Sequence, residues 1–403
     1  MVNPAIIRNQ QQTFGRLWRS LAPYVRTDRN LPVRLQEALR RREFGARDRR
    51  LYRELLYTAL RHLPWTEEIA LRSEEEAARA VAWLAADIPA THEYRATLTA
   101  GWPPLPPTVA ERARQLGVAR ELLPAWFWAH CPAAFVSPNL ETLHTRAPLW
   151  IRLQTDAPDA VLGEFTARGW SWRRSEIAPD ACEILADADL TTTDAYRAGR
   201  FEIQDLGSQL VLASADLPRG GRWLDACAGA GGKTLQLARL VGPEGRVDAY
   251  DVRAPALAEL RRRARRAGCG NIRVASRPPN DAGYDGVLVD APCSGSGTWR
   301  RAPHLKWCTT PADIAAQAGR QLELLDRFSR LVHPGGRLIY ATCSLSRAEN
   351  QAVVAAFLHH RPEFALVPPA PACGAPGDGP GLTILPARHD SDGFFVASLR
   401  RQH

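Results

Sequence analysis

Apolar side chains recur every three or four residues through the N-terminal part of the chain, which is the spacing of one helix face. Two such stripes are formed by Leu31, Leu35, Ala38 and Leu39 and by Leu51, Leu55, Leu56, Ala59 and Leu60. We predict helices over residues 14–62, with the charged residues 47–50 as the turn between the stripes. Residues 74–76 open another helix, and residues 109–116 form one more. Residues 1–140 are therefore predicted to be an all-helical domain.

The pattern changes after Pro148. Residues 149–153 alternate like a strand, residues 157–168 have helical spacing, and residues 170–174 are extended again. We predict a small α+β connector over residues 141–218.

Short apolar runs then alternate with helical segments to the end of the chain. The predicted strands cover residues 223–226, 246–250, 272–275, 286–290, 337–341 and 394–399, and one of the helices covers residues 254–267. Ser346 and Glu349 have the spacing of a capping box, so we predict that they open the last helix. Strands that alternate with helices indicate a mostly parallel sheet with both faces covered. Residues 219–403 are therefore predicted to form an α/β domain.

Residues 222–234, RWLDACAGAGGKT, have the order of a strand, a glycine-rich turn and a helix. Such a turn forms the ligand crevice at the carboxyl end of the first strand in doubly wound folds. A Walker A loop would need glycine in place of Cys227, and a dinucleotide motif would need glycine in place of Thr234. The turn thus favours S-adenosylmethionine, a nucleoside without a phosphate chain, and Asp251 after the second strand can accept its ribose hydroxyls. A turn that only packs strand against helix stays open.

Composition narrows the choice of partners and compartment. A chain of 403 residues predicts two or three domains, and a net charge of +9 with a pI near 9.4 favours a polyanionic partner such as nucleic acid. No apolar run approaches the roughly 20 residues of a membrane span, and the N-terminus does not read as a secretory signal. The eight cysteines form no C-x-x-C pair, which argues against a zinc site or a disulfide framework and predicts a cytoplasmic protein.

Lysine is almost absent from the chain. Among 52 basic residues, only Lys233 and Lys306 are lysine. This bias suggests that both positions need a compact ammonium group rather than a planar guanidinium group. Chance survival of two lysines is the alternative.

Two predicted strands run into cysteine-bearing segments, VDAPCSGSG at 289–297 and YATCS at 340–344. Carboxyl ends of strands face the crevice of an open α/β sheet, so Cys293 and Cys343 should meet beside the glycine turn. A thiolate that adds to carbon 6 of cytosine makes carbon 5 nucleophilic toward a methyl sulfonium, and a second thiol can remove the carbon 5 proton. Asp290 is placed to hold ring N3 and the exocyclic amine, and Lys233 to assist and to keep a neighbouring thiol ionised. Two structural cysteines are the alternative, and spacing does not say which thiol attacks.

Five motifs, in a fixed order along the chain, resemble those of a known family. They are DACAGAGGKT at 225–234, DAPCSGSG at 290–297, RRAPHLKW at 300–307, TCS at 342–344 and DGFF at 392–395. Together they resemble the Fmu/Sun (RsmB-type) family of RNA cytosine-5 methyltransferases over about residues 145–400, and residues 25–65 resemble more loosely its NusB-like helical RNA-binding domain. The resemblance implies a class I, Rossmann-like methyltransferase domain that uses S-adenosylmethionine. It also implies that Cys343 is the nucleophile and that Cys293 promotes product release.

The predicted cofactor site follows the glycine turn and the strand ends. Its residues are Asp225, Cys227, Ala228, Gly229, Ala230, Gly231, Gly232, Lys233, Asp251, Arg253, Asp281 and Asp290. The sequence departs from the family pattern at Ala230, where proline is usual, and after the third strand, where an Asp near the adenine is usual. We expect Asp281 or a backbone amide to substitute there.

We predict an enzyme that methylates carbon 5 of a cytosine in structured RNA, specifically 16S ribosomal RNA. Its partner is RNA, contacted by arginines of the helical and connector domains, and the protein is expected to be a monomer without a metal or a membrane contact. The alternative is a non-catalytic RNA-binding or ribosome-assembly factor with a degenerate cofactor site. A methyltransferase for a small molecule or a protein is disfavoured by the basic charge and the paired thiols.

Overall fold

The computed structural model describes residues 4–40, 44–280, 283–370 and 379–402. Its contacts divide the chain into two compact units. One lies within residues 1–147 and 298–310, and the other within residues 148–297 and 311–403. The division into three domains at residues 140 and 218 stays a prediction.

The first unit is built from helices throughout its described residues, as the apolar spacing predicts. These are α1 (Pro4–Leu21), η1 (Ala22–Tyr24), α2 (Leu31–Leu39), α3 (Ala46–Arg61), α4 (Leu63–Ala70), α5 (Glu74–Leu84), α6 (His92–Leu98), α7 (Val109–Leu116), η2 (Ala125–Ala129), η3 (Pro132–Phe135), α8 (Asn139–Leu143) and α14 (Pro303–Cys308). Across the whole described part of the chain, no helix has the length and apolar character needed to cross a bilayer.

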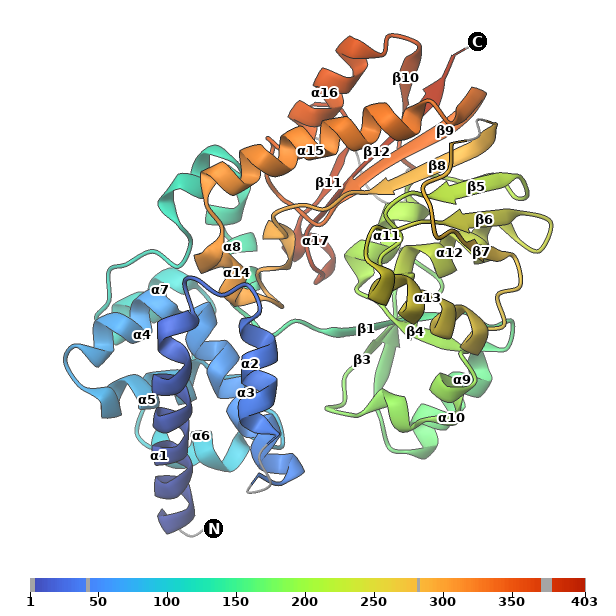
Figure 1. Cartoon of the computed structure of the whole chain (residues 1–403). Helices are drawn as coiled ribbons and strands as arrows, with labels where there is room; N and C mark the ends of the chain where they lie inside the picture. Colours follow the sequence, from blue (N-terminus) through green and yellow to red (C-terminus); the bar gives the residue numbers. More distant parts are fainter. Residues whose placement is uncertain (1–3, 41–43, 281–282, 371–378, 403) are drawn as a thin grey trace. The chain divides into compact units, whose positions relative to one another are not determined.

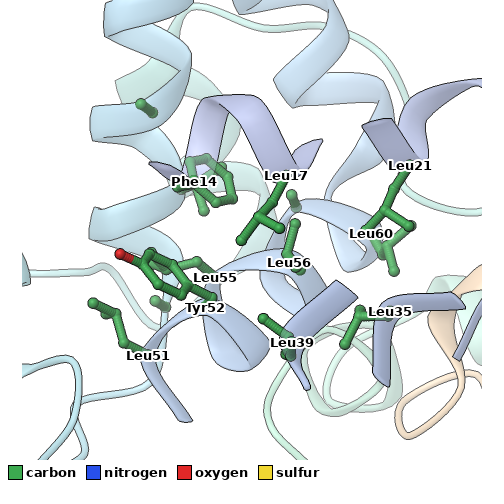
Figure 2. Packing of buried hydrophobic residues seen from close by; sticks show 14 of the residues in the cluster. Phe14, Leu17, Leu21, Leu35, Leu39, Leu51, Tyr52, Leu55, Leu56 and Leu60 are labelled. Carbon is green, nitrogen blue, oxygen red and sulfur yellow. The ribbon is translucent and has the colours of Figure 1, made fainter. Parts of the chain in front are cut away.

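The two predicted apolar stripes meet in the core of this unit. Leu35 and Leu39 of α2 pack with Leu55 of α3 and with Phe14 of α1, and all four side chains are buried (Figure 2). Burial of apolar surface contributes about 25 cal/mol per Å². The helices therefore form because each presents one continuous apolar face to its neighbours.

One local prediction in this unit is wrong. Residues 47–50 are not a turn between helices but lie in the first turn of α3. Gly45 precedes the helix in extended backbone, and Asp48 stands in the first turn, where a negative charge is stabilised by the helix dipole. The charged run is therefore the exposed start of a helix.

The segment 298–310 belongs to the helical unit although it lies between the motifs that carry the family resemblance. The indole nitrogen of Trp307 donates to the carbonyl of Leu60 at 2.8 Å. The Lys306 ammonium donates to the carbonyl of Arg61 and lies near the imidazole of His144, both at 2.9 Å. Lys306 is buried, and this burial lowers its pKa well below the usual value. The second of the two lysines therefore ties its segment into the helical unit.

The second unit begins with a small antiparallel sheet of order β2-β3-β1-β4. Its strands are β1 (Leu149–Leu153), β2 (Trp172–Arg174), β3 (Ala181–Ile184) and β4 (Phe201–Ile203), accompanied by α9 (Pro158–Ala167), η4 (Leu190–Thr192), α10 (Asp194–Arg197) and α11 (Leu206–Ala213). The predicted strands at 149–153 and 170–174 and the helix at 157–168 are confirmed to within a few residues. The sequence analysis missed β3 and β4, because β3 is buried along its whole length and β4 has only three residues.

A larger sheet of order β10-β12-β9-β8-β5-β6-β7 follows, with β11 paired to β12. Its strands are β5 (Arg222–Asp225), β6 (Arg246–Ala249), β7 (Ile272–Val274), β8 (Tyr284–Asp290), β9 (Val332–Thr342), β10 (Phe364–Val367), β11 (Leu382–Ile384) and β12 (Phe394–Arg401). The neighbouring strands β7, β6, β5, β8 and β9 are parallel to one another, and β12 runs antiparallel to β9. The predicted mostly parallel sheet is therefore confirmed.

Helices cover both faces of this sheet (Figure 1). They are α12 (Gly232–Val241), α13 (Ala254–Arg266), α15 (Pro311–Ser329) and α16 (Gln351–His360), with the short η5 (Ser296–Thr298) and α17 (Pro386–His389). Val287 and Val289 of β8 pack in one core with residues of α15 and α16, whereas Leu288 packs in the other core with residues of α11 and α12. Alternate residues of a strand point to opposite faces, so this division makes three layers. The predicted α/β, class I Rossmann-like fold is confirmed.

The predicted capping box at the last helix is wrong. Helix α16 begins at Gln351, and its cap residue Asn350 makes no side-chain capping bond. The side chain of Glu349 is instead fully buried and accepts hydrogen bonds from Ser294 and Ser344. The Glu349 carboxylate, which the local spacing assigns to a helix end, thus makes its hydrogen bonds with residues outside the helix.

Candidate active site

The glycine turn joins β5 to α12 at the carboxyl edge of the sheet. Gly231 caps α12 with φ 92°, a conformation that favours glycine. A Cβ on Gly231 would also lie 2.8 Å from the side chain of Leu260. Gly229 has φ 53° and leaves its side of the turn free of a Cβ. Glycine at 231 is therefore required both by the backbone conformation and by the close packing against Leu260.

Asp225 ends β5 directly before this turn and is 1% exposed. One carboxylate oxygen accepts a 2.7 Å hydrogen bond from the hydroxyl of Thr234. The other oxygen is buried and has no hydrogen-bond partner among the described residues. Burial raises the pKa of Asp225 to about 7, an effect that the Thr234 hydrogen bond partly opposes. The free oxygen is an acceptor that a ligand amine or hydroxyl could satisfy.

Asp251 follows β6 and lies over the turn. Its carboxylate accepts from the backbone N–H of Gly229 and from the backbone N–H of Arg253, both at 2.8 Å, and the Arg253 guanidinium adds a 3.0 Å contact. Burial alone would raise the pKa of Asp251, but the hydrogen bonds from Arg253 and Gly229 lower it below the usual value. The structure therefore brings the two predicted carboxylates, Asp225 and Asp251, to the two ends of one turn.

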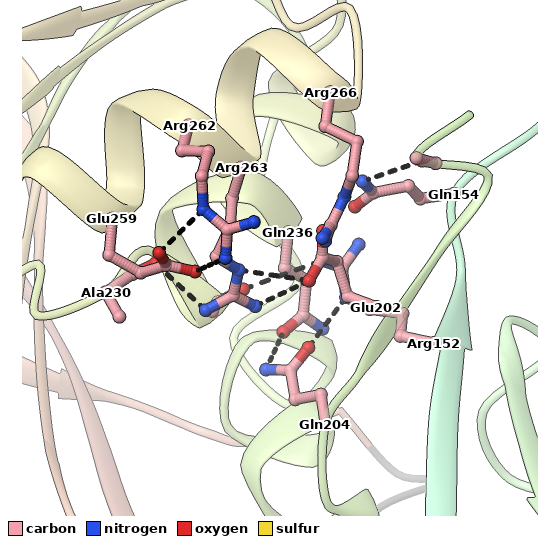
Figure 3. A network of polar contacts seen from close by, with 12 residues as sticks. Arg152, Gln154, Glu202, Gln204, Ala230, Gln236, Glu259, Arg262, Arg263 and Arg266 are labelled. Carbon is pink, nitrogen blue, oxygen red and sulfur yellow. Dashed lines mark hydrogen bonds and ion pairs between the residues drawn. The ribbon is translucent and has the colours of Figure 1, made fainter. Parts of the chain in front are cut away.

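The structure gives fewer contacts for the other residues that were predicted to bind the cofactor. Cys227 is half-buried, and burial with the neighbouring carboxylates raises the pKa of its thiol well above the usual value, so it is not a thiolate. Ala228 is buried beneath the turn. Asp281 lies outside the described residues, and β7 ends at Val274 without an acidic residue. The turn itself is braced by Arg263 of α13, whose guanidinium donates to the carbonyl of Ala230 at 2.9 Å (Figure 3).

Lys233, in the first turn of α12, and Asp290, at the end of β8, form an ion pair. The ammonium lies 2.9 Å from the carboxylate, and Lys233 is 8% exposed. The ammonium also lies 4.9 Å from the centre of the Phe394 ring, within reach of a cation–π contact. The hydrogen bond of Lys233 to Asp290 is compatible with the predicted assisting role, whereas its predicted effect on a thiol stays a prediction. This pairing fixes the direction of the carboxylate.

The two thiols meet beside this pair. Their sulfur atoms are 3.3 Å apart although Cys293 and Cys343 lie 50 positions apart in sequence. They follow neighbouring parallel strands, because β8 and β9 pair in the register Asp290 to Ala341. The hydrogen bond with Cys343, together with burial, raises the pKa of the Cys293 thiol well above its usual value.

A glycine of the Cys293 motif and a glycine of the DGFF motif hold the thiol segments together. The N–H of Gly297 donates to the carbonyl of Cys343 at 2.9 Å, and the N–H of Gly393 donates to the carbonyl of Gly297 at 2.8 Å. A Cβ on Gly297 would lie 1.9 Å from the carbonyl oxygen of Gly393. Three chain segments can approach this closely only because both positions are glycine.

The sequence analysis missed one group that contacts both thiol segments, the buried carboxylate of Glu349. Its hydrogen bonds reach Ser294 and Ser344, the residues directly after the two cysteines. A signal existed in the largely polar run from Ser344 to Asn350, which directly follows an apolar strand and the TCS motif. The capping-box spacing offered a simpler explanation and concealed it.

The crevice as a whole fits S-adenosylmethionine. Asp225 keeps an unsatisfied buried oxygen, and two glycines of the turn, Gly229 and Gly231, take positive φ. Asp251 and Asp290 are already paired with Arg253 and Lys233, so the hydrogen-bonding groups of this edge, rather than an excess of negative charge, suit a nucleoside.

Known proteins are similar to this chain in sequence and in fold. A family model described as 16S rRNA methyltransferase RsmB/F matches residues 212–400. The ribosomal RNA small subunit methyltransferase B of Vibrio cholerae is 34% identical over 274 residues, which cover 66% of this chain and 61% of that protein. The protein of the same name from Salmonella arizonae is 33% identical over 292 residues, which cover 70% of this chain and 67% of that protein.

The chain thus spans about three fifths of the length of the Vibrio relative. A solved structure, that of the protein PH0851, covers 91% of this chain and 93% of its own, with a TM-score of 0.72 at 23% identity. This likeness shows a shared fold. From the matched motifs, the α/β architecture and these relatives, the chain belongs to the RsmB/F family of S-adenosylmethionine-dependent methyltransferases.

Proposed function

We propose that this protein transfers a methyl group to carbon 5 of a cytosine in 16S ribosomal RNA through a covalent bond between Cys343 and carbon 6. The observation that carries the proposal is the 3.3 Å separation of the Cys293 and Cys343 sulfur atoms at the edge of the methyl-donor crevice. Two thiols this close can supply both the nucleophile and the base that this reaction needs. The relatives named for ribosomal RNA support the substrate class.

The reaction divides between the two sulfur atoms. The Cys343 thiolate adds to carbon 6, and the ring electrons move to carbon 5. S-adenosylmethionine, when bound, supplies the electrophilic methyl group. The Cys293 thiolate then takes the proton from carbon 5, the electron pair of that C–H bond restores the C5–C6 double bond, and Cys343 leaves as a thiolate.

Charged residues of the crevice hold the two ligands. We assign Asp290 to ring N3 and the exocyclic amine of the base, with Lys233 orienting its carboxylate. Asp225, Asp251 and the backbone of the glycine turn would hold S-adenosylmethionine, with Arg253 and Cys227 beside them. The net charge of +9 favours binding of the RNA backbone. A cytosine within structured RNA must be unstacked to enter such a crevice.

The test uses cysteine variants with RNA transcripts and S-adenosylmethionine. Cys293→Ala should accumulate a covalent protein–RNA adduct that survives denaturing electrophoresis, and Cys343→Ala should form none. Cys269→Ala is the matched control, because this thiol is half-buried and is not among the predicted site residues, and it should behave as the unchanged protein. An adduct in Cys343→Ala and none in Cys293→Ala would reverse the assignments. Titration calorimetry with S-adenosylmethionine separates the enzyme from a non-catalytic assembly factor, which would give no binding heat.

A further inference from the structure

A buried carboxylate links the two thiol-bearing segments from behind. Glu349 has no exposed surface, and its oxygens accept from the N–H of Ser294 at 2.8 Å, from the Ser294 hydroxyl at 2.5 Å and from the Ser344 hydroxyl at 2.6 Å. Ser294 directly follows Cys293, and Ser344 directly follows Cys343. One side chain therefore holds the residue next to each sulfur atom.

The same carboxylate is connected to helix α15. The amide of Gln321 donates to Glu349 at 3.1 Å and to the carbonyl of Pro292 at 2.9 Å. The hydroxyl of Tyr340 contacts the Gln321 side chain at 3.0 Å and the Glu349 backbone carbonyl at 2.5 Å. The contact to Pro292 restrains the residue before Cys293, so that cysteine is held from both sides.

The neighbouring residue completes the arrangement for the other cysteine. The amide of Asn350 donates to the carbonyl of Ser344 at 2.8 Å, and its oxygen accepts from the hydroxyl of Thr342 at 2.6 Å. Thr342 and Ser344 flank Cys343. Each cysteine is thus bracketed by hydrogen bonds that converge on residues 349 and 350.

The chemistry of Glu349 is unusual for a purely structural residue. Four hydrogen-bond donors from three residues aim at its two oxygens, which is the pattern of an ionised carboxylate. Within the described residues, no arginine or lysine pairs with it. Burying a charge without a counter-charge is costly, and replacement by apolar residues is often neutral or stabilising. It also does not cap α16, so the local structure gives no reason for it.

We propose that Glu349 is the positioning residue that sets the separation and orientation of the Cys293 and Cys343 sulfur atoms. Its catalytic consequence rests on the function proposed above, whereas its geometric role does not. The titratable groups that face Cys293 are Tyr340 of β9, Cys343, which directly follows β9, and Glu349. The negative charge of Glu349 contributes to the raised pKa of the Cys293 thiol, after the Cys343 hydrogen bond and burial.

The experiment replaces Glu349 by glutamine, which has nearly the same size but no charge and presents amide donors to groups that also donate. Dibromobimane, which becomes fluorescent when both its arms react with thiols, reports the proximity of the sulfur atoms without RNA or cofactor. We expect Glu349→Gln to lower the rate of the Cys293–Cys343 cross-link at least tenfold, as identified by mass spectrometry of the joined peptides. The pH midpoint for iodoacetamide alkylation of Cys293 should shift to lower pH, because a neighbouring negative charge is removed.

The control is Glu323→Gln on α15, an exposed glutamate in the same unit, which should leave both measurements unchanged. A Glu349→Gln protein with the cross-linking rate and alkylation profile of the unchanged protein would overturn the proposal. Should this variant fail to fold, Ser294→Ala and Ser344→Ala each remove one arm of the bridge and should each slow cross-linking severalfold. Normal rates in both serine variants would equally overturn it.

These thiol measurements also test the positioning role of Glu349 separately from the proposed methyl transfer. Adduct formation is followed separately in the Cys293→Ala background, where Glu349→Gln should reduce the rate of RNA attachment. If Cys293→Ala forms no adduct while Glu349→Gln still slows cross-linking, the proposed function fails and the positioning role of Glu349 stands. If the Cys293→Ala protein forms its adduct at the same rate with and without Glu349→Gln, the catalytic consequence of the positioning fails, whereas normal cross-linking overturns the positioning itself.

Discussion

Removal of Glu202 should destabilise the second unit strongly. Glu202 lies on β4, is 2% exposed, and pairs with two arginines of α13 (Figure 3). Its oxygens lie 2.7 Å from the guanidinium of Arg263 and 2.5 Å from that of Arg266. The side chains of these arginines are only 15% and 11% exposed. The Glu202→Ala variant therefore leaves two largely buried cations without their shared counter-charge.

The expected cost follows from this burial. Removing one partner of a buried ion pair costs about 3–5 kcal/mol, because the remaining charge stays desolvated. For a domain of this size, each kcal/mol shifts the melting temperature by about 2–4 °C, so the shift should be roughly 6–20 °C. Arg263 also donates to the carbonyl of Ala230 in the glycine turn, so the affinity for S-adenosylmethionine should fall with it.

Differential scanning calorimetry of the whole chain measures the transition of the second unit. The control is Glu259→Ala on α13, which removes an exposed ion pair with Arg262 and should leave the transition within experimental error. Replacing both arginines as well, in Glu202→Leu with Arg263→Met and Arg266→Met, should recover much of the lost stability, since no charge then remains buried. A loss below about 1 kcal/mol in Glu202→Ala would refute the reasoning, because it would mean that water satisfies the arginines.

Three further predictions concern the sheet and the crevice. Gly286→Ala should destabilise the protein by at least about 1–3 kcal/mol in denaturant titrations, because its Cβ would lie 2.1 Å from the Trp223 ring; an unchanged midpoint would contradict this packing. Burial raises the pKa of Asp225 from 3.8 to about 7, so its contribution to stability is complete below pH 3.8 and is lost as the pH rises through 7. Asp225→Asn should therefore be more stable than the unchanged protein at pH 8, by up to roughly 4 kcal/mol, but not at pH 4, and parallel stability curves would exclude the shift. Lys233→Met leaves the Asp290 carboxylate without its cation, and in the adduct assay it should slow attachment by about 10²-fold, whereas an unchanged rate would remove Lys233 from the reaction.

Much of the fold could be predicted because its signals are local. The strands that end at Asp225 and Asp290 carry short apolar runs, and the glycines after them mark the turns. The meeting of Cys293 and Cys343 follows from one topological rule, that carboxyl ends of parallel strands share an edge. The rule needs only the strand assignment, which the apolar pattern supplies.

Predictions failed where tertiary contacts outweigh local spacing. Ser346 and Glu349 satisfy the capping-box pattern, yet Glu349 gains more from four donors in the interior than from the end of α16. Residues 298–310 carry a methyltransferase motif, yet their contacts are with the helical unit. No periodicity in the sequence records which distant segment supplies a partner, so these assignments need three-dimensional contacts.

The two lysines show how a bias in composition can carry structural information. Both lysines are buried. The amino group of Lys233 lies between the Asp290 carboxylate and the Phe394 ring. The amino group of Lys306 lies between the backbone carbonyl of Arg61 and the imidazole of His144. A guanidinium group is larger and planar, and its donors point along fixed directions within one plane. Arginine in either place would present a larger, planar group to partners that are placed for a single nitrogen atom. The chain therefore keeps lysine where both the size and the direction of the cation are constrained, and uses arginine at its other basic positions.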